Sequence, residues 1–144
     1  AQCLVGSEMC IRDSSLEGAA EKLTAQRGYT FYTGPEDDMG HTVRNYPAAW
    51  LAPPELHAVE GRTHGRATYD MTLLLLRPGA RISPAERRTA LAEMEAQMIE
   101  IFAELSLDER ILAVEGLSVR PRSFSLTPHG EISQTATARI VTWF

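Results

Sequence analysis

Residues 69–105 constrain the fold of this 144-residue chain more than any other stretch. Within it, the run MTLLLL at residues 71–76 has apolar side chains on both faces of an extended strand. Such a run favours a central strand that is covered on both sides, whereas a membrane span needs about 20 apolar residues. Pro78 and Gly79 follow directly and predict a turn.

A long amphipathic helix is predicted after that turn. Ser83 precedes Pro84 and is followed three residues later by Glu86, which together form a capping box with proline at the first helical position. Apolar residues then recur at spacings of three and four up to residue 105, with polar residues opposite. The apolar face comprises Leu91, Met94, Met98, Ile101, Phe102 and Leu105, and the polar face comprises Glu93, Gln97, Glu100 and Glu104.

Weaker patterns predict the remaining elements. Ser14 and Glu17 repeat the capping pattern at the start of a short first helix, which Gly28 ends. Aromatic, β-branched or alternating apolar residues indicate strands, and clusters of Gly, Pro and acidic residues indicate loops. In chain order we expect a strand at 29–33, a loop at 34–44, a strand at 46–51, a connecting segment at 55–65, a strand at 66–77, a helical turn within 107–114 that Gly116 ends, and a terminal hairpin of 117–126 with 132–144.

This order of elements predicts an α+β fold, with a mostly antiparallel sheet packed against one long amphipathic helix plus a short N-terminal helix. The terminal hairpin must complete a sheet with the central strand, because an isolated hairpin is only marginally stable in water. Residues 3–14, CLVGSEMCIRDS, resemble a translated sequencing-adapter remnant. We therefore expect residues 1–14 to be a non-native leader and residues 15–144 to form a single α+β domain.

An acidic cluster between the first two predicted strands is the most promising candidate site. Glu36, Asp37, Asp38 and His41 form the densest group of potential metal ligands or acid–base residues, but the calcium-loop spacing D-x-[DN]-x-[DN]-G is absent. A solvated surface loop is the simplest interpretation, and a contact loop for a protein partner is the best functional alternative. A metal-dependent binder or small enzyme stays open as a further alternative, built from Asp37, Asp38, His41, His57 or His64.

Charge and missing motifs restrict the other classes of function. A net charge of −5 and a pI near 5.4 argue against a broad electrostatic grip on nucleic acid. Two local basic strips, one with Arg62, His64 and Arg66 and one with Arg120 and Arg122, are expected on solvated strand faces. Cys3 and Cys10 lack the further ligands of a zinc site. Because no nucleophile elbow, H-E-x-x-H helix, phosphate loop or C-x-x-C pair occurs, we predict no enzyme, cofactor or metal.

Over about residues 15–144, the order and lengths of the elements resemble the small tail-terminator, or tail-completion, proteins of tailed bacteriophages and prophages. The segments YPAAWL at 46–51 and TATARIVTWF at 135–144 take part in this resemblance. It implies a structural virion protein without an active site, which forms a ring, usually a hexamer, on the tail tube, stops tube growth and meets the head connector. The implied partners are further copies of the chain, tail-tube proteins and head-connector proteins, without membrane or specific nucleic-acid binding.

The resemblance also implies a location in the virion tail, and in the host cytoplasm during assembly. If it holds, Glu36, Asp37, Asp38 and His41 are candidates for contacts between subunits or with the tube. Two alternatives stay open besides the metal-dependent one. Another head–tail joining protein would share the composition and oligomerisation, whereas a stand-alone ligand-binding or regulatory α+β domain predicts a deep apolar pocket between helix and sheet.

Overall fold

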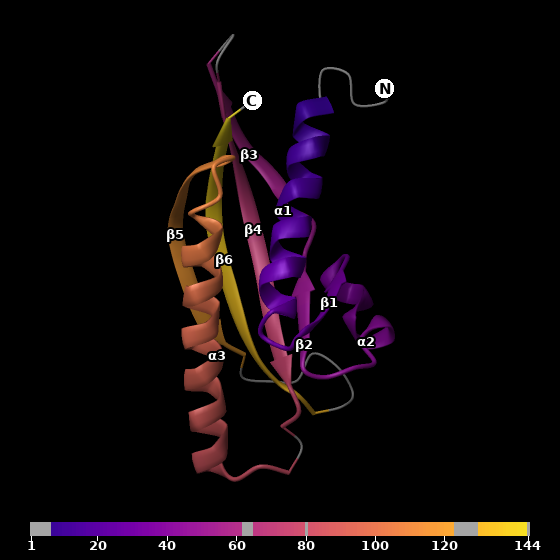
Figure 1. Ribbon diagram of the computed structural model, residues 1–144. Coiled ribbons are helices and arrows are strands. Elements are labelled where there is room, and N and C mark those ends of the chain that lie inside the picture. Colours follow the sequence, from indigo (N-terminus) through magenta and orange to yellow (C-terminus); the bar gives the residue numbers. More distant parts are fainter. Residues whose placement is uncertain (1–6, 62–64, 80, 123–129, 144) are drawn as a thin grey trace.

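The computed structural model describes residues 7–61, 65–79, 81–122 and 130–143 (Figure 1). These residues form an α+β fold, as predicted, in which two long helices lie on one face of a mostly antiparallel six-stranded sheet. In chain order the elements are α1 (Ser7–Ala25), β1 (Thr30–Thr33), the 3₁₀ turn η1 (Glu36–Asp38), α2 (Met39–Thr42), β2 (Ala48–Leu51), β3 (Glu55–Glu60), β4 (Arg66–Arg77), α3 (Pro84–Leu105), β5 (Ile111–Pro121) and β6 (Ile132–Trp143). Among the helices in the described ranges, none has the length and the apolar composition of a membrane span.

The sheet is built around β4 and β6, which pair with each other along their whole length. The strand order is β1-β2-β4-β6-β5. Among the described strands, only β1 and β2, at one edge of the sheet, pair in parallel. β3 and β2 pair with successive parts of the same side of β4, first with Arg66–Asp70 and then with Leu73–Leu76. The predicted central strand and terminal hairpin are thus confirmed.

The main core lies between the sheet and the helices α1 and α3. Side chains of β4 from Ala67 to Leu75 alternate between the two faces of the sheet, and those on the helix side are buried beneath α3. The start of α3 is as predicted, because the Ser83 hydroxyl accepts a hydrogen bond from the Glu86 N–H (3.1 Å). Five residues of its expected apolar face are fully buried: Met94, Met98, Ile101, Phe102 and Leu105.

A second, smaller core covers one end of the opposite face. There Leu74 and Leu76 of β4 pack with Trp50 of β2 and with Met39 and Val43 from the segment containing α2. The leucine run of β4 is therefore apolar on both faces because both are covered at this end of the strand.

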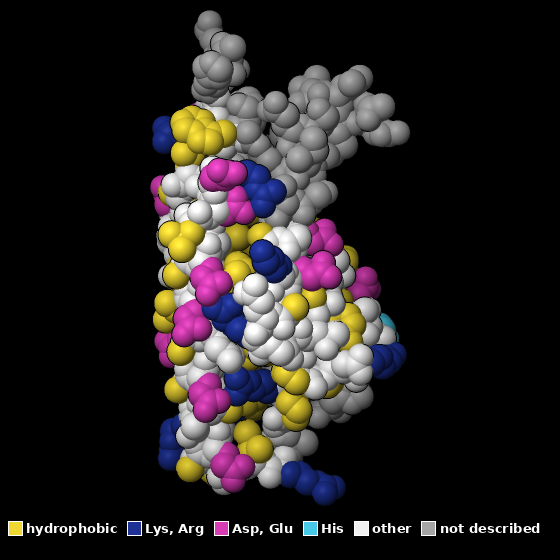
Figure 2. Space-filling view, viewed as in Figure 1, with side chains coloured by type: hydrophobic (Ala, Val, Ile, Leu, Met, Phe, Trp, Pro, Cys, Tyr) yellow, Lys and Arg dark blue, Asp and Glu magenta, His cyan; other side chains and the backbone are white. Residues whose placement is uncertain are grey.

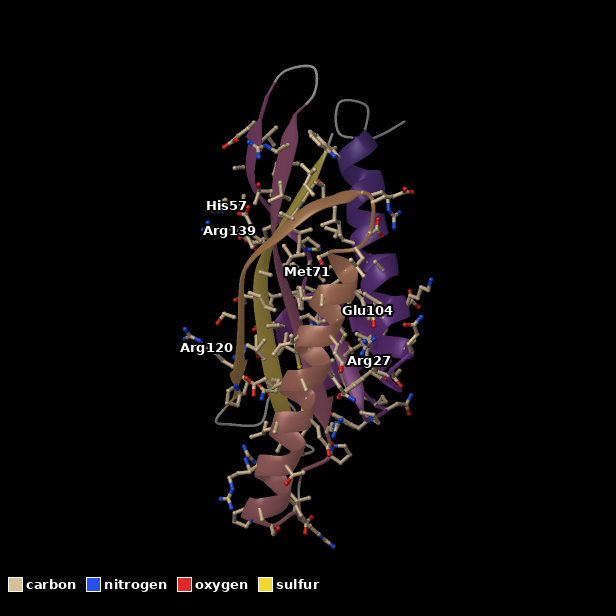
Figure 3. All side chains as sticks on the ribbon, turned by 60° about the vertical axis from the view of Figure 1, so that its left-hand side comes forward. Arg27, His57, Met71, Glu104, Arg120 and Arg139 are labelled. Atoms are coloured by element: carbon tan, nitrogen blue, oxygen red, sulfur yellow. The ribbon has the colours of Figure 1, made fainter. Side chains whose placement is uncertain are left out.

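The rest of that opposite face has no helix over it, and we call it the open face. Its side chains lie on three neighbouring strands, and Figure 3 shows Arg120 and Arg139 projecting from it, away from α3. It comprises Thr68, Asp70 and Thr72 of β4, Thr135, Thr137, Arg139, Val141 and Trp143 of β6, and Ala113, Glu115, Ser118 and Arg120 of β5. Most of these residues are polar, which is the usual composition of a sheet face in contact with water.

Residues Glu55–Glu60 form strand β3, so the connecting segment predicted for 55–65 is wrong over this part. Only Ala58 is partly buried, and the other five residues are exposed. An edge strand exposed on both faces has no alternation of apolar and polar residues, because it is held by backbone hydrogen bonds that do not depend on side chains.

β5 begins at Ile111, so the helical turn predicted within 107–114 is also wrong. Asp108 forms a tight turn instead, in which its carboxylate accepts a hydrogen bond from the Arg110 N–H (2.9 Å). Gly116 does not end an element but lies inside β5 at a bulge, where its φ of 63° favours glycine.

α1 begins at Ser7, so Ser14, the predicted capping residue, lies inside the helix. No glycine or proline interrupts residues 7–17, so nothing local stops the helix from extending towards the N-terminus. That residues 1–14 are a non-native leader stays a prediction. Residues 123–129 of the predicted hairpin lie outside the described residues, and neither cysteine side chain is described.

Candidate interaction surface

The four candidate contact residues lie on one short helical segment beside the open face. Glu36, Asp37 and Asp38 form η1, and His41 belongs to α2, which follows without a break. All four side chains are exposed, which fits a solvated surface segment and a contact segment equally, but the loop predicted for 34–44 is partly helical. The reason is Met39, which is only 1% exposed and packs into the second core, so that η1 and α2 wind around it.

This acidic segment is fixed to the sheet at both ends. The Trp50 indole N–H donates to the carbonyl of Gly34 (2.9 Å) just before η1. After α2, the Tyr32 hydroxyl accepts from the backbone N–H groups of Arg44 (3.3 Å) and Asn45 (3.2 Å). Because these contacts hold the segment in place, little backbone entropy would be lost if its carboxylates bound another molecule.

Arg122, just beyond the end of β5, connects the acidic segment to the open face. Its guanidinium donates to the Glu36 carboxylate (3.1 Å) and to the Thr135 hydroxyl (3.0 Å), and its N–H donates to the Ser133 carbonyl (3.0 Å). Sequence reasoning singled out Arg122 only as part of a basic strip, since its partner Glu36 lies 86 residues away. Asp37 and Asp38 make no side-chain hydrogen bond or ion pair with any described residue.

The end of the open face next to Arg122 is hollowed, with a volume of about 490 Å³. Arg120 lies opposite Thr135 and Ser118 lies opposite Thr137 in the pairing of β5 with β6, so these side chains form two adjacent rows. Arg120 is exposed and has no ion pair with any residue in the described ranges. We call this hollow the Arg120 groove; it is lined by Ser118, Arg120, Pro121, Arg122, Thr135 and Thr137.

The middle of the open face carries alternating charges that neutralise one another. Asp70 contacts His57 of β3 (Nδ1 to Oδ2, 3.1 Å) and Arg139 of β6 (Nε to Oδ1, 3.8 Å), and Glu115 lies opposite Arg139 on β5. These groups border a second hollow of about 570 Å³. His57 thus has a partner on β4 and is not joined with the acidic segment, while His64 lies outside the described residues. Among the residues that the structure describes, no group of three or more His, Cys, Asp or Glu could hold a metal ion.

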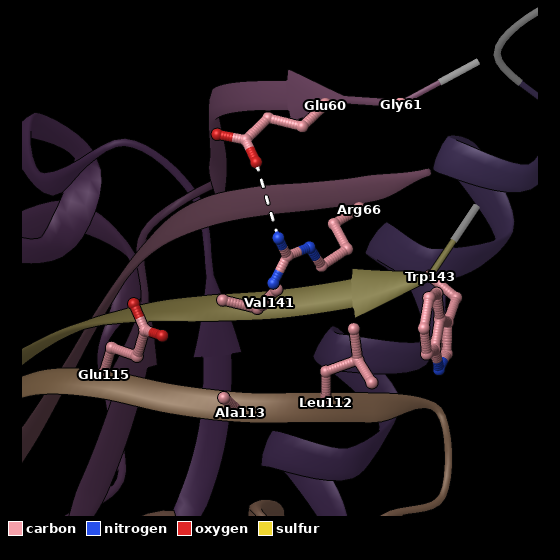
Figure 4. Close-up of a pocket in the computed structure, with 8 residues that line it drawn as sticks. All are labelled: Glu60, Gly61, Arg66, Leu112, Ala113, Glu115, Val141 and Trp143. Atoms are coloured by element: carbon pink, nitrogen blue, oxygen red, sulfur yellow. Dashed lines mark ion pairs between the residues drawn. The ribbon is translucent and has the colours of Figure 1, made fainter. Parts of the chain in front are cut away.

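A third hollow, of about 550 Å³, lies at the other end of the open face (Figure 4). Leu112, Val141 and Trp143 give it an apolar side, and Trp143 is 47% exposed. Arg66 and Glu60 form a loose ion pair at its rim (3.7 Å). Leu112 lies where β5 shifts its register against β6, and this displacement leaves it 38% exposed, a feature without any sequence signal.

The charges on the helix side of the sheet have structural partners. Arg77 donates to the Tyr29 hydroxyl (3.1 Å) and to Glu93 of α3 (2.8 Å), and burial raises the pKa of Tyr29 although the hydrogen bond from Arg77 opposes it. Arg27 likewise binds Glu104 (2.7 Å) and joins α1 to α3. Acidic and basic side chains are interspersed over this side of the molecule (Figure 2). These ion pairs link the helices to each other and to the sheet, whereas other charged residues of the helices, such as Glu17 and Arg88, are exposed and make no ion pair with any described residue.

Taken with its surroundings, the open face is suited to binding a charged protein surface through ion pairs and hydroxyl groups. It combines the guanidinium of Arg120 with the carboxylates of Asp37 and Asp38 on the adjoining segment, none of which has a partner in the part of the chain that the structure describes. No protein-family profile and no curated protein sequence matches the chain.

Proposed function

We propose that this chain is a structural virion protein of a phage or prophage, which joins copies of itself into a ring, caps the tail tube and links it to the head connector. The observation that carries the proposal is the open face with its adjoining acidic segment, where charged groups without a partner among the described residues lie near partly exposed apolar ones. Exposed apolar groups bordered by polar and charged ones are a feature of protein interaction sites, and complementary charges guide the partner to them.

The shape of the sheet gives further support. Its path of paired strands ends in β1 on one side and β5 on the other, so a neighbouring copy has two different borders to approach. A ring needs such heterologous contacts, in which one patch meets a different patch of the next subunit. The resemblance in the order of elements supplies the specific role on the tail tube, with a hexamer as the expected ring.

The first experiment measures the native mass of the whole chain by light scattering over a concentration series. The proposal expects a discrete hexamer, or a monomer that converts to one as the concentration rises. Negative-stain images of that species should show closed rings, and adding it to growing tail-tube subunits from the same genome should stop elongation. A strict monomer at every concentration contradicts self-assembly, and a ring that leaves tube growth unchanged favours another head–tail joining protein.

A ligand-binding or regulatory domain is the second candidate, and the hollow beside Trp143 favours it. This hollow has the volume of a small-molecule site and an apolar side formed by Leu112 and Val141. It lies on the open face, however, and not between helices and sheet, where a stand-alone ligand-binding domain was expected to bind. Fluorescence of Trp143, compared with a Trp143→Phe variant during a screen of small apolar ligands, tests this candidate.

A further inference from the structure

The Arg120 groove combines several hydroxyl groups with one cation that has no partner among the residues of the described ranges. We propose that it binds the carboxylates of Asp37 and Asp38 from a second copy of the chain. This inference rests on the proposed function, since it specifies the contact through which neighbouring subunits would join.

The groups in the groove are suited to an oxyanion. The Arg120 guanidinium has only donors, in a planar arrangement that matches a carboxylate. Thr135 already accepts a hydrogen bond from Arg122 (3.0 Å), so its own hydroxyl hydrogen is left to donate. Ser118 and Thr137 add two further hydroxyls, one on each strand.

A carboxylate fits the groove better than a phosphate of nucleic acid. At its rim, the guanidinium of Arg122 already binds the carboxylate of Glu36 from the same chain. The groove therefore already accepts one carboxylate at its edge. The net charge of −5 opposes the approach of a polyanionic backbone, whereas it permits a local contact between one basic groove and one acidic segment.

The acidic segment of a second copy is the occupant that the charges favour. Within one chain, Glu36 is bound by Arg122, while Asp37 and Asp38 are exposed and Arg120 has no partner among the described residues. Each chain therefore carries both halves of a complementary contact. In a ring, the groove of each copy would meet the acidic segment of the next, so that the contact repeats from copy to copy until the ring closes, whereas a reciprocal exchange of the same contact between two copies would give a dimer.

Charge reversal at either half tests the contact. Arg120→Glu alone, or Asp37→Lys together with Asp38→Lys, should raise the concentration of half-assembly by about tenfold or more, since like charges then face each other. Raising the salt concentration should weaken assembly of the unaltered chain in the same direction. Arg88→Glu on α3 and Glu17→Lys on α1 are the matched controls, since both residues are exposed and lie away from the open face, and they should leave the native mass unchanged.

Mixing the two reversed proteins gives the sharpest readout. Each alone should stay dispersed, but together they should assemble as alternating subunits, because each then supplies the charge that the other needs. Circular dichroism of each variant serves as the folding control. Both should be folded, because the changed side chains are exposed.

The outcomes separate this inference from the proposed function. A ring that survives both reversals, or a mixture that fails to assemble, overturns the Arg120 contact and leaves the ring standing. A strict monomer of the unaltered chain overturns both. A dimer that the reversals dissolve supports the contact and contradicts the ring. Binding of a short DNA duplex that Arg120→Glu abolishes, with the native mass unchanged, overturns the carboxylate as occupant.

Discussion

At the scale of single residues, Gly79 shows how closely the chain approaches itself after β4. A Cβ atom at this position would stand 2.7 Å from Cγ2 of Ile132 and 3.1 Å from its backbone nitrogen. Because the branched side chain and backbone of Ile132 cannot easily retreat, Gly79→Ala should lower the free energy of unfolding by about 1–3 kcal/mol, measured by urea denaturation.

Gly18→Ala provides the matched control for that substitution. No atom lies within 4 Å of a Cβ built at Gly18, which is exposed inside α1. Alanine is favoured over glycine inside a helix, so Gly18→Ala should raise the free energy of unfolding by up to about 1 kcal/mol. If Gly79→Ala is also neutral or stabilising, the close approach to Ile132 is not as described.

Asp108 gives the molecule a specific sensitivity to acid. Its hydrogen bonds from the Arg110 side chain lower the pKa of the carboxyl from 3.8 to about 2, although partial burial opposes this. Because the pKa is depressed in the folded state, the carboxylate stabilises the fold fully above pH 4 and loses this contribution as the pH falls towards 2. Because Arg110 is exposed and solvent screens its charge, the contribution of the Asp108 carboxylate to the free energy of unfolding is roughly 1 kcal/mol.

Unfolding by urea at pH 5 and pH 2.5 tests this prediction. Asp108→Asn should lower the free energy of unfolding by roughly 1 kcal/mol at pH 5 and by clearly less at pH 2.5, because pH 2.5 lies between the carboxyl's pKa of 3.8 in the unfolded chain and about 2 in the folded protein. Glu109→Gln removes the adjacent carboxylate and serves as the control. Equal losses for Asp108→Asn at both pH values would show that its charge does not matter.

At the scale of elements, the acidic segment depends on one buried side chain. Met39 packs against Trp50 and Leu74 and so anchors η1 and α2. Because Met39→Ala would leave a cavity there, it should lower the free energy of unfolding, measured by urea denaturation, by about 2–4 kcal/mol. Since the segment would also lose its fixed position, assembly should weaken. His41→Ala, on the exposed side of the same short helix, should change the stability by less than about 0.5 kcal/mol. A Met39→Ala protein as stable as the His41→Ala control would contradict the anchoring role.

The elements that the sequence predicted correctly are those with strong local patterns. β4 is a long apolar run, α3 has a capping box and a full apolar face, and β6 alternates between core and solvent. β3 was missed because both its faces are exposed, and the start of β5 was missed because Asp108 and Glu109 suit a helix N-terminus as well as a turn.

The candidate site was predicted only in part, for a similar reason. Its acidic half is contiguous in the chain, so Glu36, Asp37, Asp38 and His41 were recognisable as a cluster. The Arg120 groove depends on the pairing of β5 with β6, and the ion pair of Arg122 with Glu36 depends on the whole sheet. A single sequence carries no local signal for such contacts between distant residues.

At the scale of the whole molecule, the two faces of the sheet have different roles in the proposed assembly. The helix-covered face contains the main core and the ion pairs that join the helices, whereas the groups of the proposed contact, Arg120, Asp37 and Asp38, lie on the open face and on η1. Subunits should therefore meet through the open face, and α3 should remain on a surface that assembly leaves exposed.

Hydrogen exchange tests this division over the whole chain at once. Amides of η1, α2 and the second half of β5 should exchange more slowly in the assembled protein than in dispersed Arg120→Glu at the same concentration, because the neighbouring copy shields them from water and restrains local opening. Amides of α3 should exchange at equal rates in both samples, since no contact is expected there. Slower exchange in α3, with η1 unchanged, would mean that copies meet through the helices, and the ring would then have to be built on a different pair of surfaces.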